Sequence, residues 1–277
     1  FFDIVHAMDC SCRYCRQGML ADGMEPSKPE DRIAYGTKVI DHFKTDLTAF
    51  IRKTMADCTV FYNSGHVGPF VLPTKEAYTH FELESLPSGG WGYVHFPMSI
   101  RYARTLGHDC MGMTGKFHTS WGDFHSFKNP EALQFECYMM LAHGAKCSVG
   151  DQLHPDGEIC ETTYDLIGPV YQEVERKEPW CSGVKPVVDI GVLSPEEFTD
   201  ERIPLSSAGA VRMLQEGGHQ FDIVDTSADL SPSRVMILPD DIQVSEAFAD
   251  KLQAFVDGGK ECVDLRRVAF CDAFDRT

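Results

Sequence analysis

Short apolar segments alternate with amphipathic segments along this chain, and that alternation limits the folds that it can adopt. We expect strands at 1–6, 60–65, 80–84, 110–114 and 146–150. Apolar side chains at helical spacing predict helices at 31–57, around 98–106, at 129–144 and at 162–177. Strands that alternate with helices in this way are typical of a parallel sheet with helices on its faces.

The five strands fit two parallel architectures. A (β/α)8 TIM barrel takes about 200–250 residues, so residues 1–181 would supply only its last five βα units. The alternative is an open α/β sheet. In both cases we place one domain at 1–181.

A second alternation follows a boundary near Glu178–Gly183. It predicts strands at 187–193, 221–224 and 235–238, with helices at 207–216 and after Ser245. This is the first half of a flavodoxin-like α/β domain, which we place at 184–277. The tail from Glu261 is charged and lacks the apolar strand expected next, so we expect this domain to be incomplete at its C-terminal side.

Charge and cysteine content narrow the function. The formal net charge is −17, from 25 basic and 42 acidic residues, which disfavours nucleic-acid binding and favours a neutral substrate. No apolar run approaches the roughly 18 residues that span a bilayer, so we expect no membrane segment. The eleven cysteines are an odd, scattered set rather than a disulfide framework, which predicts a reducing, cytoplasmic location.

Carboxylates, imidazoles and indoles recur where the predicted strands end. Because parallel strands end on one face of the sheet, these groups should converge on one site, as in carbohydrate-active enzymes. Glycoside hydrolysis requires two carboxyl groups, one ionised as nucleophile and one protonated as general acid. Asp3, at the end of the first strand, is the candidate nucleophile.

Glu82 and Glu84 lie two residues apart on one strand, so both point to the same face, together with His80. We rank Glu84 first as the acid/base because it is nearer to the loops, and Glu82 second. One of the pair is expected to be a structural ion-pair partner, and the alternative that neither is catalytic stays open.

Other side chains beyond the strand ends are candidates for sugar contacts. Trp91 and Trp121 could stack on a sugar face, or could pack in an ordinary core or loop. Four further polar side chains could bind sugar hydroxyls or have only structural roles: His6, His118, Asp151 and His154.

Cys10, Cys12 and Cys15 form a C-x-C-x-x-C motif directly after the first strand. Thiolates at this spacing suit a structural zinc ion, which needs a fourth ligand. His6, Asp9 or a cysteine outside this chain are the candidates. The alternative is three free thiols, and we expect the chemistry itself to require no cofactor.

Several blocks of this sequence resemble a bacterial group of hypothetical glycosyl hydrolases that includes α-L-fucosidases of glycoside hydrolase family one hundred and fifty-one. The resemblance covers nearly all of residues 1–180, and the blocks that carry it are Phe81–Pro87, Trp91–Tyr93, Gly112–His118, Ser120–Asp123, Gly150–Pro155 and Glu178–Trp180. It implies a TIM barrel whose visible strands are the fourth to the eighth. By analogy with family twenty-nine fucosidases, it also implies that the nucleophile is Asp3 and that the acid/base is Glu84 or Glu82.

Two further resemblances concern assembly and metal. Residues 186–259 resemble the β-galactosidase trimerisation domain, an amidotransferase-like fold, which implies a homo-oligomer and names a trimer as one candidate. Residues 10–15 resemble part of the zinc cluster of family forty-two β-galactosidases, in which a fourth cysteine comes from an earlier segment. With three barrel units missing, we expect this chain alone to be poorly active or inactive.

The leading hypothesis is therefore a retaining, exo-acting α-L-fucosidase that acts on an oligosaccharide or glycoside. A β-galactosidase-like hydrolase is the rival enzyme. A non-catalytic carbohydrate-binding or assembly protein is the rival of another class.

Overall fold

The computed structural model describes residues 1–199 and 201–265 and divides into two compact units. One unit holds residues 1–65 and 71–82, and the other holds 66–70 and the described residues from 83 onward. The chain is mixed α/β with parallel sheets, as the alternation predicts. Among the described residues, none of the helices is both long enough and apolar enough to span a membrane.

The first unit is built around a long helix. Its helices are α1 (Arg13–Ala21), which the sequence analysis missed, and α2 (Pro29–Thr54). Proline at the first position of α2 is preorganised for a helix start, and Arg52 and Lys53 in the last turn complement the helix dipole.

The buried face of α2 differs from the expected apolar stripe. Phe43 and Phe50, which belong to the apolar pattern that predicts a helix at 31–57, are 42% and 64% exposed, whereas Lys44 and Thr48 are buried. The reason is hydrogen bonding, because the Thr48 hydroxyl lies 2.8 Å from the Tyr62 hydroxyl and donates to the Ala77 carbonyl at 2.9 Å. A satisfied polar group can be buried at little cost, which apolar periodicity does not reveal.

The strands expected at 1–6 and 60–65 are reduced to one parallel bridge between Phe2 and Tyr62. The Phe2 N–H donates to Phe61 and the Asn63 N–H donates to Phe2. Extended pairing ends there because Ile4 has a φ of 52°, a left-handed conformation that a β-branched residue rarely adopts.

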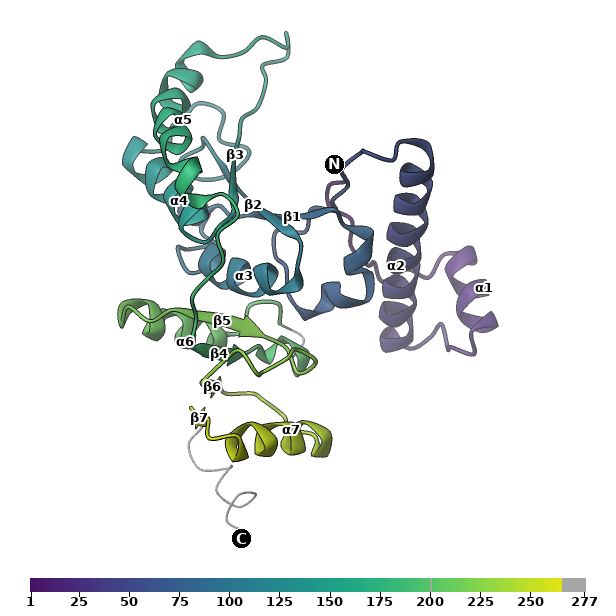
Figure 1. The fold of residues 1–277 in the computed structure, drawn as a ribbon. Helices are drawn as coiled ribbons and strands as arrows, with labels where there is room; N and C mark the ends of the chain where they lie inside the picture. Colours follow the sequence, from purple (N-terminus) through teal and green to yellow (C-terminus); the bar gives the residue numbers. More distant parts are fainter. Residues whose placement is uncertain (200, 266–277) are drawn as a thin grey trace. The chain divides into compact units, whose positions relative to one another are not determined.

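The second unit holds most of the regular structure (Figure 1). Its first sheet has the order β1-β2-β3. The strands of this sheet are β1 (His80–Glu84, whose last two residues belong to this unit), β2 (Asp109–Gly115) and β3 (Lys146–Gly150). The helices that follow them are α3 (His95–Ala103), α4 (Pro130–Ala142) and α5 (Glu161–Cys181).

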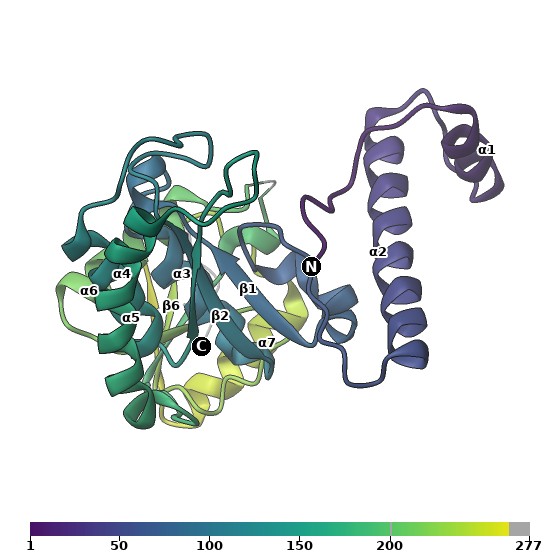
Figure 2. The same cartoon turned by 90° about the horizontal axis from the view of Figure 1, so that it is seen from above.

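These elements lie within a few residues of their predicted positions, and a side-chain cap fixes the start of α4. The Asn129 side chain accepts the Glu131 N–H at 2.9 Å, with Pro130 at the first position of α4. Helix α4 packs on β2 and β3, and α5 packs beside α4 (Figures 1 and 2). The described residues also contain four 3-10 segments: η1 (Pro69–Ala77), η2 (Pro87–Gly89), η3 (Arg104–Leu106) and η4 (Pro195–Glu197).

The second sheet has the order β5-β4-β6-β7, with all its pairs parallel. Its strands are β4 (Ile190–Leu193), β5 (Phe221–Val224), β6 (Val235–Leu238) and β7 (Glu261–Asp264), and its helices are α6 (Leu205–Glu216) and α7 (Glu246–Asp257). The helix predicted after Ser245 is confirmed, and the Ser245 side chain caps it by accepting the Phe248 N–H at 3.2 Å.

Strand β7 corrects the expectation that no strand follows α7. Two of its four residues are charged and none is fully buried, yet its backbone pairs with β6 from Glu261 to Asp264. A strand at the edge of the described sheet needs backbone hydrogen bonds on one side only. The packing of Cys262 against the core of this sheet is therefore enough to hold β7 in place. The remainder of the tail, 266–277, lies outside the described residues.

Helix α3 connects the two sheets of this unit, since it contacts β2 as well as β5 and α6 (Figure 1). Two polar contacts reinforce this junction. The Tyr102 hydroxyl donates to Asp225 at 2.9 Å, and Arg104 Nε donates to Asp222 at 2.6 Å. Burial raises the pKa of Asp222, and the Arg104 guanidinium opposes that rise.

Two glycines give a matched test of this packing. An ideal Cβ on Gly112, in β2, would lie 2.4 Å from Met140 Cγ and 2.8 Å from the Phe96 ring, whereas one on Gly209, exposed on α6, meets nothing within 4 Å. We expect Gly112→Ala to lower the unfolding free energy by about 1–3 kcal/mol through overpacking. Gly209→Ala should raise it by about 0.5–1 kcal/mol through helix propensity. Chemical denaturation of both variants measures the difference, and equal effects would contradict this packing.

Candidate active site

The carboxyl ends of β1, β2 and β3 bring three predicted residues to one edge of the first sheet. Glu84 ends β1, Trp121 lies in the loop after β2, and Asp151 directly follows β3. Trp121 Nε1 donates to Glu84 Oε1 at 2.6 Å. A Cβ on Gly150 would lie 2.1 Å from the Trp121 ring, so the indole lies directly on the β3 backbone. One tryptophan therefore connects the ends of β1 and β3.

The loop that carries Trp121 spans residues 116–128 and is tied down at its base. The Lys116 N–H donates to Gly150 at the end of β3, and the Lys128 N–H donates to Lys116. The Lys128 ammonium is buried, and it donates to Thr114 Oγ1 at 2.7 Å and to the carboxylate of Glu136 on α4. Both ends of the loop are thus fixed to the sheet and to α4.

Asp151 and Gln152 present acceptors without donors. Both carboxylate oxygens of Asp151 and the amide oxygen of Gln152 are buried, and none has a hydrogen-bond partner among the described residues. A buried acceptor that lacks a donor costs about 1–3 kcal/mol. These atoms lie at the edge where the site candidates gather, so they suit a ligand that brings hydroxyl donors.

The two predicted glutamates have different surroundings. The Glu82 carboxylate lies 3.4 Å from His80 Nε2, and its side chain is 7% exposed. This contact fits the expected structural ion-pair partner. Glu84, by contrast, meets an indole N–H from the loop after the next strand.

The remaining candidates are more exposed. Asp3 is exposed in the first unit and accepts the Asn63 amide at 2.9 Å. His118 and His154 are exposed in the second unit. The Trp91 ring is 41% exposed and lies edge-to-face on His95, with 4.9 Å between ring centroids.

His95 is buried and is the first residue of α3. Its Nδ1 is 3.0 Å from the Ser85 hydroxyl, next to Glu84 in sequence. Burial lowers the pKa of His95 to about 4, with a smaller contribution from the neighbouring His66. His95 is therefore neutral near pH 7 and adds no charge to the site.

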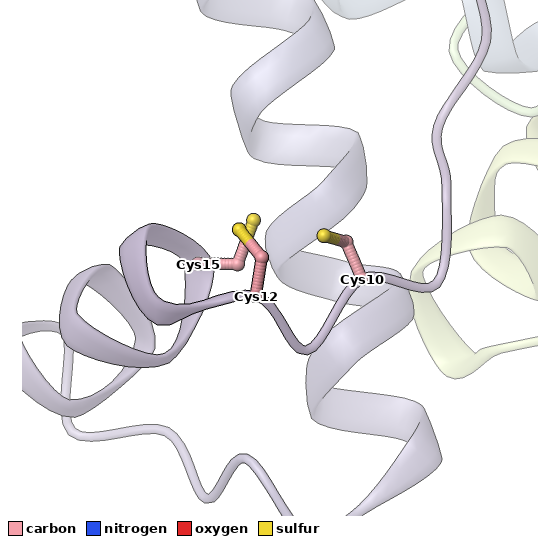
Figure 3. A group of neighbouring side chains, drawn as sticks. All are labelled: Cys10, Cys12 and Cys15. Atoms are coloured by element: carbon pink, nitrogen blue, oxygen red, sulfur yellow. The ribbon is translucent and has the colours of Figure 1, made fainter.

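The three cysteines of the C-x-C-x-x-C motif come together in the first unit. Figure 3 shows their side chains gathered where the loop before α1 meets its first turn, and the sulfur atoms lie within 4.8 Å of one another. Two thiolates on one zinc ion lie about 3.8 Å apart, given a Zn–S bond of about 2.3 Å. Small side-chain movements would thus suffice to bind zinc.

The surroundings of the thiols separate the candidates for a fourth ligand. Asp9 is held by Arg32, whose Nε and Nη2 donate to its two carboxylate oxygens at 2.5 and 3.1 Å. Exposed His6 lines the same pocket as Cys10 and Cys15. The geometry therefore favours His6 over Asp9 among the candidates from this chain.

Hydrogen bonds also shift the pKa values of two of these thiols in opposite directions. A backbone hydrogen bond from Cys15 is the main cause that lowers the pKa of the Cys12 thiol to about 7. A hydrogen bond with Cys10 is the main cause that raises the pKa of Cys15 to about 12.

Sequence reasoning missed the residues that support these groups. Lys128 and Glu136 belong to no motif. The only sequence signal for Glu136 is a charged residue within an otherwise apolar helical segment. Gln152 follows a predicted strand end, which is the same signal that identified Asp151, whereas Asn63 lies within the strand predicted at 60–65.

Comparisons with solved structures agree with the resemblance found in the sequence. The chain is similar to α-L-fucosidase isoenzyme 2 from Paenibacillus thiaminolyticus, with 42% identity and a TM-score of 0.89 over 94% of this chain and 40% of that chain. It also resembles β-galactosidases from Bacillus circulans sp. alkalophilus (16% identity, TM-score 0.68, 84% of this chain and 39% of that one) and Halorubrum lacusprofundi (17%, 0.62, 84% and 41%).

The predicted resemblance to α-L-fucosidases is thus confirmed, while the β-galactosidase likeness shows shared fold alone. This chain spans about 40% of the length of these solved structures. A comparison with protein-family models found no match, and neither did one with curated protein sequences.

The buried His95 predicts a pH-dependent stability. The folded protein keeps this ring neutral down to about pH 4, whereas an unfolded histidine takes up a proton near pH 6.5. Between these values the unfolded state binds more protons, so the unfolding free energy should fall by about 1.4 kcal/mol for each pH unit as pH drops from 6.5 to 4. Denaturation of His95→Gln between pH 4 and 7 should give a flatter profile, whereas the exposed-site variant His125→Gln should keep the original slope.

Proposed function

We propose that this chain supplies catalytic groups of a retaining, exo-acting glycoside hydrolase of the α-L-fucosidase type. The observation that carries the proposal is the group of Glu84, Trp121 and Asp151 at one sheet edge. The 42% identity to an α-L-fucosidase over 94% of the chain supports the substrate class. The proposed substrate is an oligosaccharide or glycoside with a terminal α-L-fucosyl residue.

In the proposed mechanism, an Asp3 carboxylate oxygen attacks the anomeric carbon and forms a covalent glycosyl ester. Glu84 gives its proton to the departing glycosidic oxygen, so that the leaving group departs as an alcohol. Glu84 then removes a proton from water, which attacks the same carbon and releases the sugar and the Asp3 carboxylate. The contact between Glu82 and His80 supports Glu84 over Glu82 in this role, and Glu82 is the second candidate.

The unpartnered acceptors of Asp151 and Gln152 support a role in binding sugar hydroxyls, because each hydroxyl brings one donor. Exposed Trp91 can offer its ring to an apolar sugar face. His6, His118 and His154 are the remaining proposed contacts.

For the architecture, we propose that 1–181 is a TIM-barrel domain represented by its last five βα units. We propose that 184–277 is a flavodoxin-like, amidotransferase-type domain. Numbered along this domain, its strand order β5-β4-β6-β7 is 2-1-3-4, the start of the flavodoxin order, which supports the second assignment. Its proposed role is to associate subunits into a homo-oligomer.

We further propose a structural zinc ion on Cys10, Cys12 and Cys15. Bound zinc would supply a cross-link between the N-terminal loop and α1, rather than chemistry on the substrate. The lowered pKa of Cys12 supports this role, because the thiolate is the form that binds metal.

The proposed function is tested by hydrolysis of aryl glycosides by the protein that carries this chain. We expect aryl α-L-fucosides to be cleaved with retention, and Asp3→Ala to abolish turnover because no carboxylate can attack. Azide should restore turnover as an inverted glycosyl azide. Glu84→Gln should lower kcat by about 10²–10⁴, the usual contribution of a general acid.

Two variants control this experiment. Glu82→Gln should affect kcat less than Glu84→Gln, and Glu76→Gln, whose side chain is 82% exposed, should leave it unchanged. Preferential cleavage of aryl β-galactosides would favour the rival enzyme. Sugar binding without any hydrolysis would favour the non-catalytic alternative.

Cobalt(II) titration tests the metal site, because thiolate-to-cobalt charge transfer gives a near-ultraviolet absorption band that nitrogen and oxygen ligands do not give. We expect one equivalent to bind, with loss of the band in Cys12→Ser and no change in Cys58→Ser, which lies outside the cluster. His6→Ala should weaken binding if His6 is the fourth ligand, and Asp9→Asn should not. An absent band in the unaltered protein would contradict the proposed zinc site.

A further inference from the structure

We propose that Trp121 is a positioning residue for the acid/base Glu84, and that its N–H assigns the transferable proton to Glu84 Oε2. This inference rests on the proposed function of Glu84. It gives Trp121 a different role from the sugar stacking that its position in the sequence suggested.

The assignment follows from hydrogen-bond chemistry. The indole Nε1–H can only donate, and it lies 2.6 Å from Oε1 of Glu84. Oε1 is therefore the acceptor in this contact. The carbonyl oxygen of a protonated carboxyl group accepts better than its hydroxyl oxygen, so the indole favours Oε1 as the carbonyl oxygen. When Glu84 is in its acid form, the proton lies on Oε2, so Oε2 is the oxygen that protonates the departing glycosidic oxygen.

The indole is itself held in place on several sides. Its ring lies against Gly150, where a Cβ would come within 2.1 Å of the ring, and it packs edge-to-face on buried Phe117 with 5.2 Å between centroids. Only glycine at position 150 leaves room for this approach. The donor is thus preorganised before substrate binds, which is what a general acid requires.

The supports of the loop extend this preorganisation to α4. Lys128 closes the 116–128 loop at Lys116 and pairs with Glu136, whose side chain is 4% exposed. Tyr93 donates to the other oxygen of Glu136 at 3.2 Å. A displacement of this network would therefore move the Trp121 donor without altering Glu84 itself.

Trp121→Phe keeps an aromatic ring and removes the donor. Aryl α-L-fucosides with basic leaving groups need protonation, whereas those with acidic leaving groups need little. We expect kcat/KM to fall about tenfold or more for the basic leaving groups, a part of the full general-acid effect, with a much smaller fall for the acidic ones. The basic limb of the pH–rate profile, which follows the protonated acid, should also shift, whereas the acidic limb, which follows the ionised nucleophile, should not. Trp180→Phe, at an 82% exposed site, should change none of these values.

Gly150→Ala provides a second variant that keeps Trp121 and Glu84. Its methyl group would displace the indole, so the same dependence on the leaving group should appear. Equal losses for both leaving-group classes in Trp121→Phe, or no loss in either variant, would overturn the positioning role.

A measurement without substrate separates this inference from the proposed function. The indole N–H resonance of ¹⁵N-labelled Trp121, assigned by its loss in Trp121→Phe, should titrate with the Glu84 carboxyl, and this titration should disappear in Glu84→Gln. If the protein cleaves no fucoside, the proposed function is wrong, but this resonance still shows whether Trp121 donates to Glu84. A resonance indifferent to Glu84→Gln would overturn the inference even in an active enzyme.

Discussion

The buried ion pair between Lys128 and Glu136 is the interaction on which the rest of the candidate site depends. The two side chains are 1% and 4% exposed, so both charges have lost most of their hydration. Such a pair is tolerated only when further hydrogen bonds satisfy the remaining polar atoms. Thr114 and Tyr93 meet that requirement here, and removal of either charge would leave its partner buried and alone at a cost of about 3–5 kcal/mol. The loop that carries the indole is thereby coupled to the core.

Much of the second unit could be predicted from sequence because its signals are local. Strands β1, β3, β5 and β6 match their predicted positions. The predicted helix after Ser245 is also found, because the Ser245 side chain accepts a backbone N–H at the start of α7. The first unit was less predictable. A left-handed Ile4 and a buried, hydrogen-bonded Thr48 both depend on tertiary context, which apolar periodicity does not contain.

The residues of the candidate site also differ in whether local sequence signals could predict them. Glu84 and Asp151 could be found because they occur where strands end, a rule that needs only the strand positions. The contact between Trp121 and Glu84 joins residues 37 positions apart, and the pairing of Asp9 with Arg32 joins residues 23 apart. No spacing rule predicts such pairs, because each depends on the path of a loop. The two-residue spacing of Glu82 and Glu84 could not rank them, whereas their partners distinguish them.

The indole of Trp121 also has a spectroscopic consequence. The chain contains three tryptophans, of which Trp180 is largely exposed and Trp91 partly exposed. Excitation redistributes electron density from the pyrrole toward the benzene ring of an indole, so a carboxylate at the N–H alters both the energy and the yield of emission. The intrinsic fluorescence of this protein should therefore carry a contribution that reports the charge of Glu84, without any label.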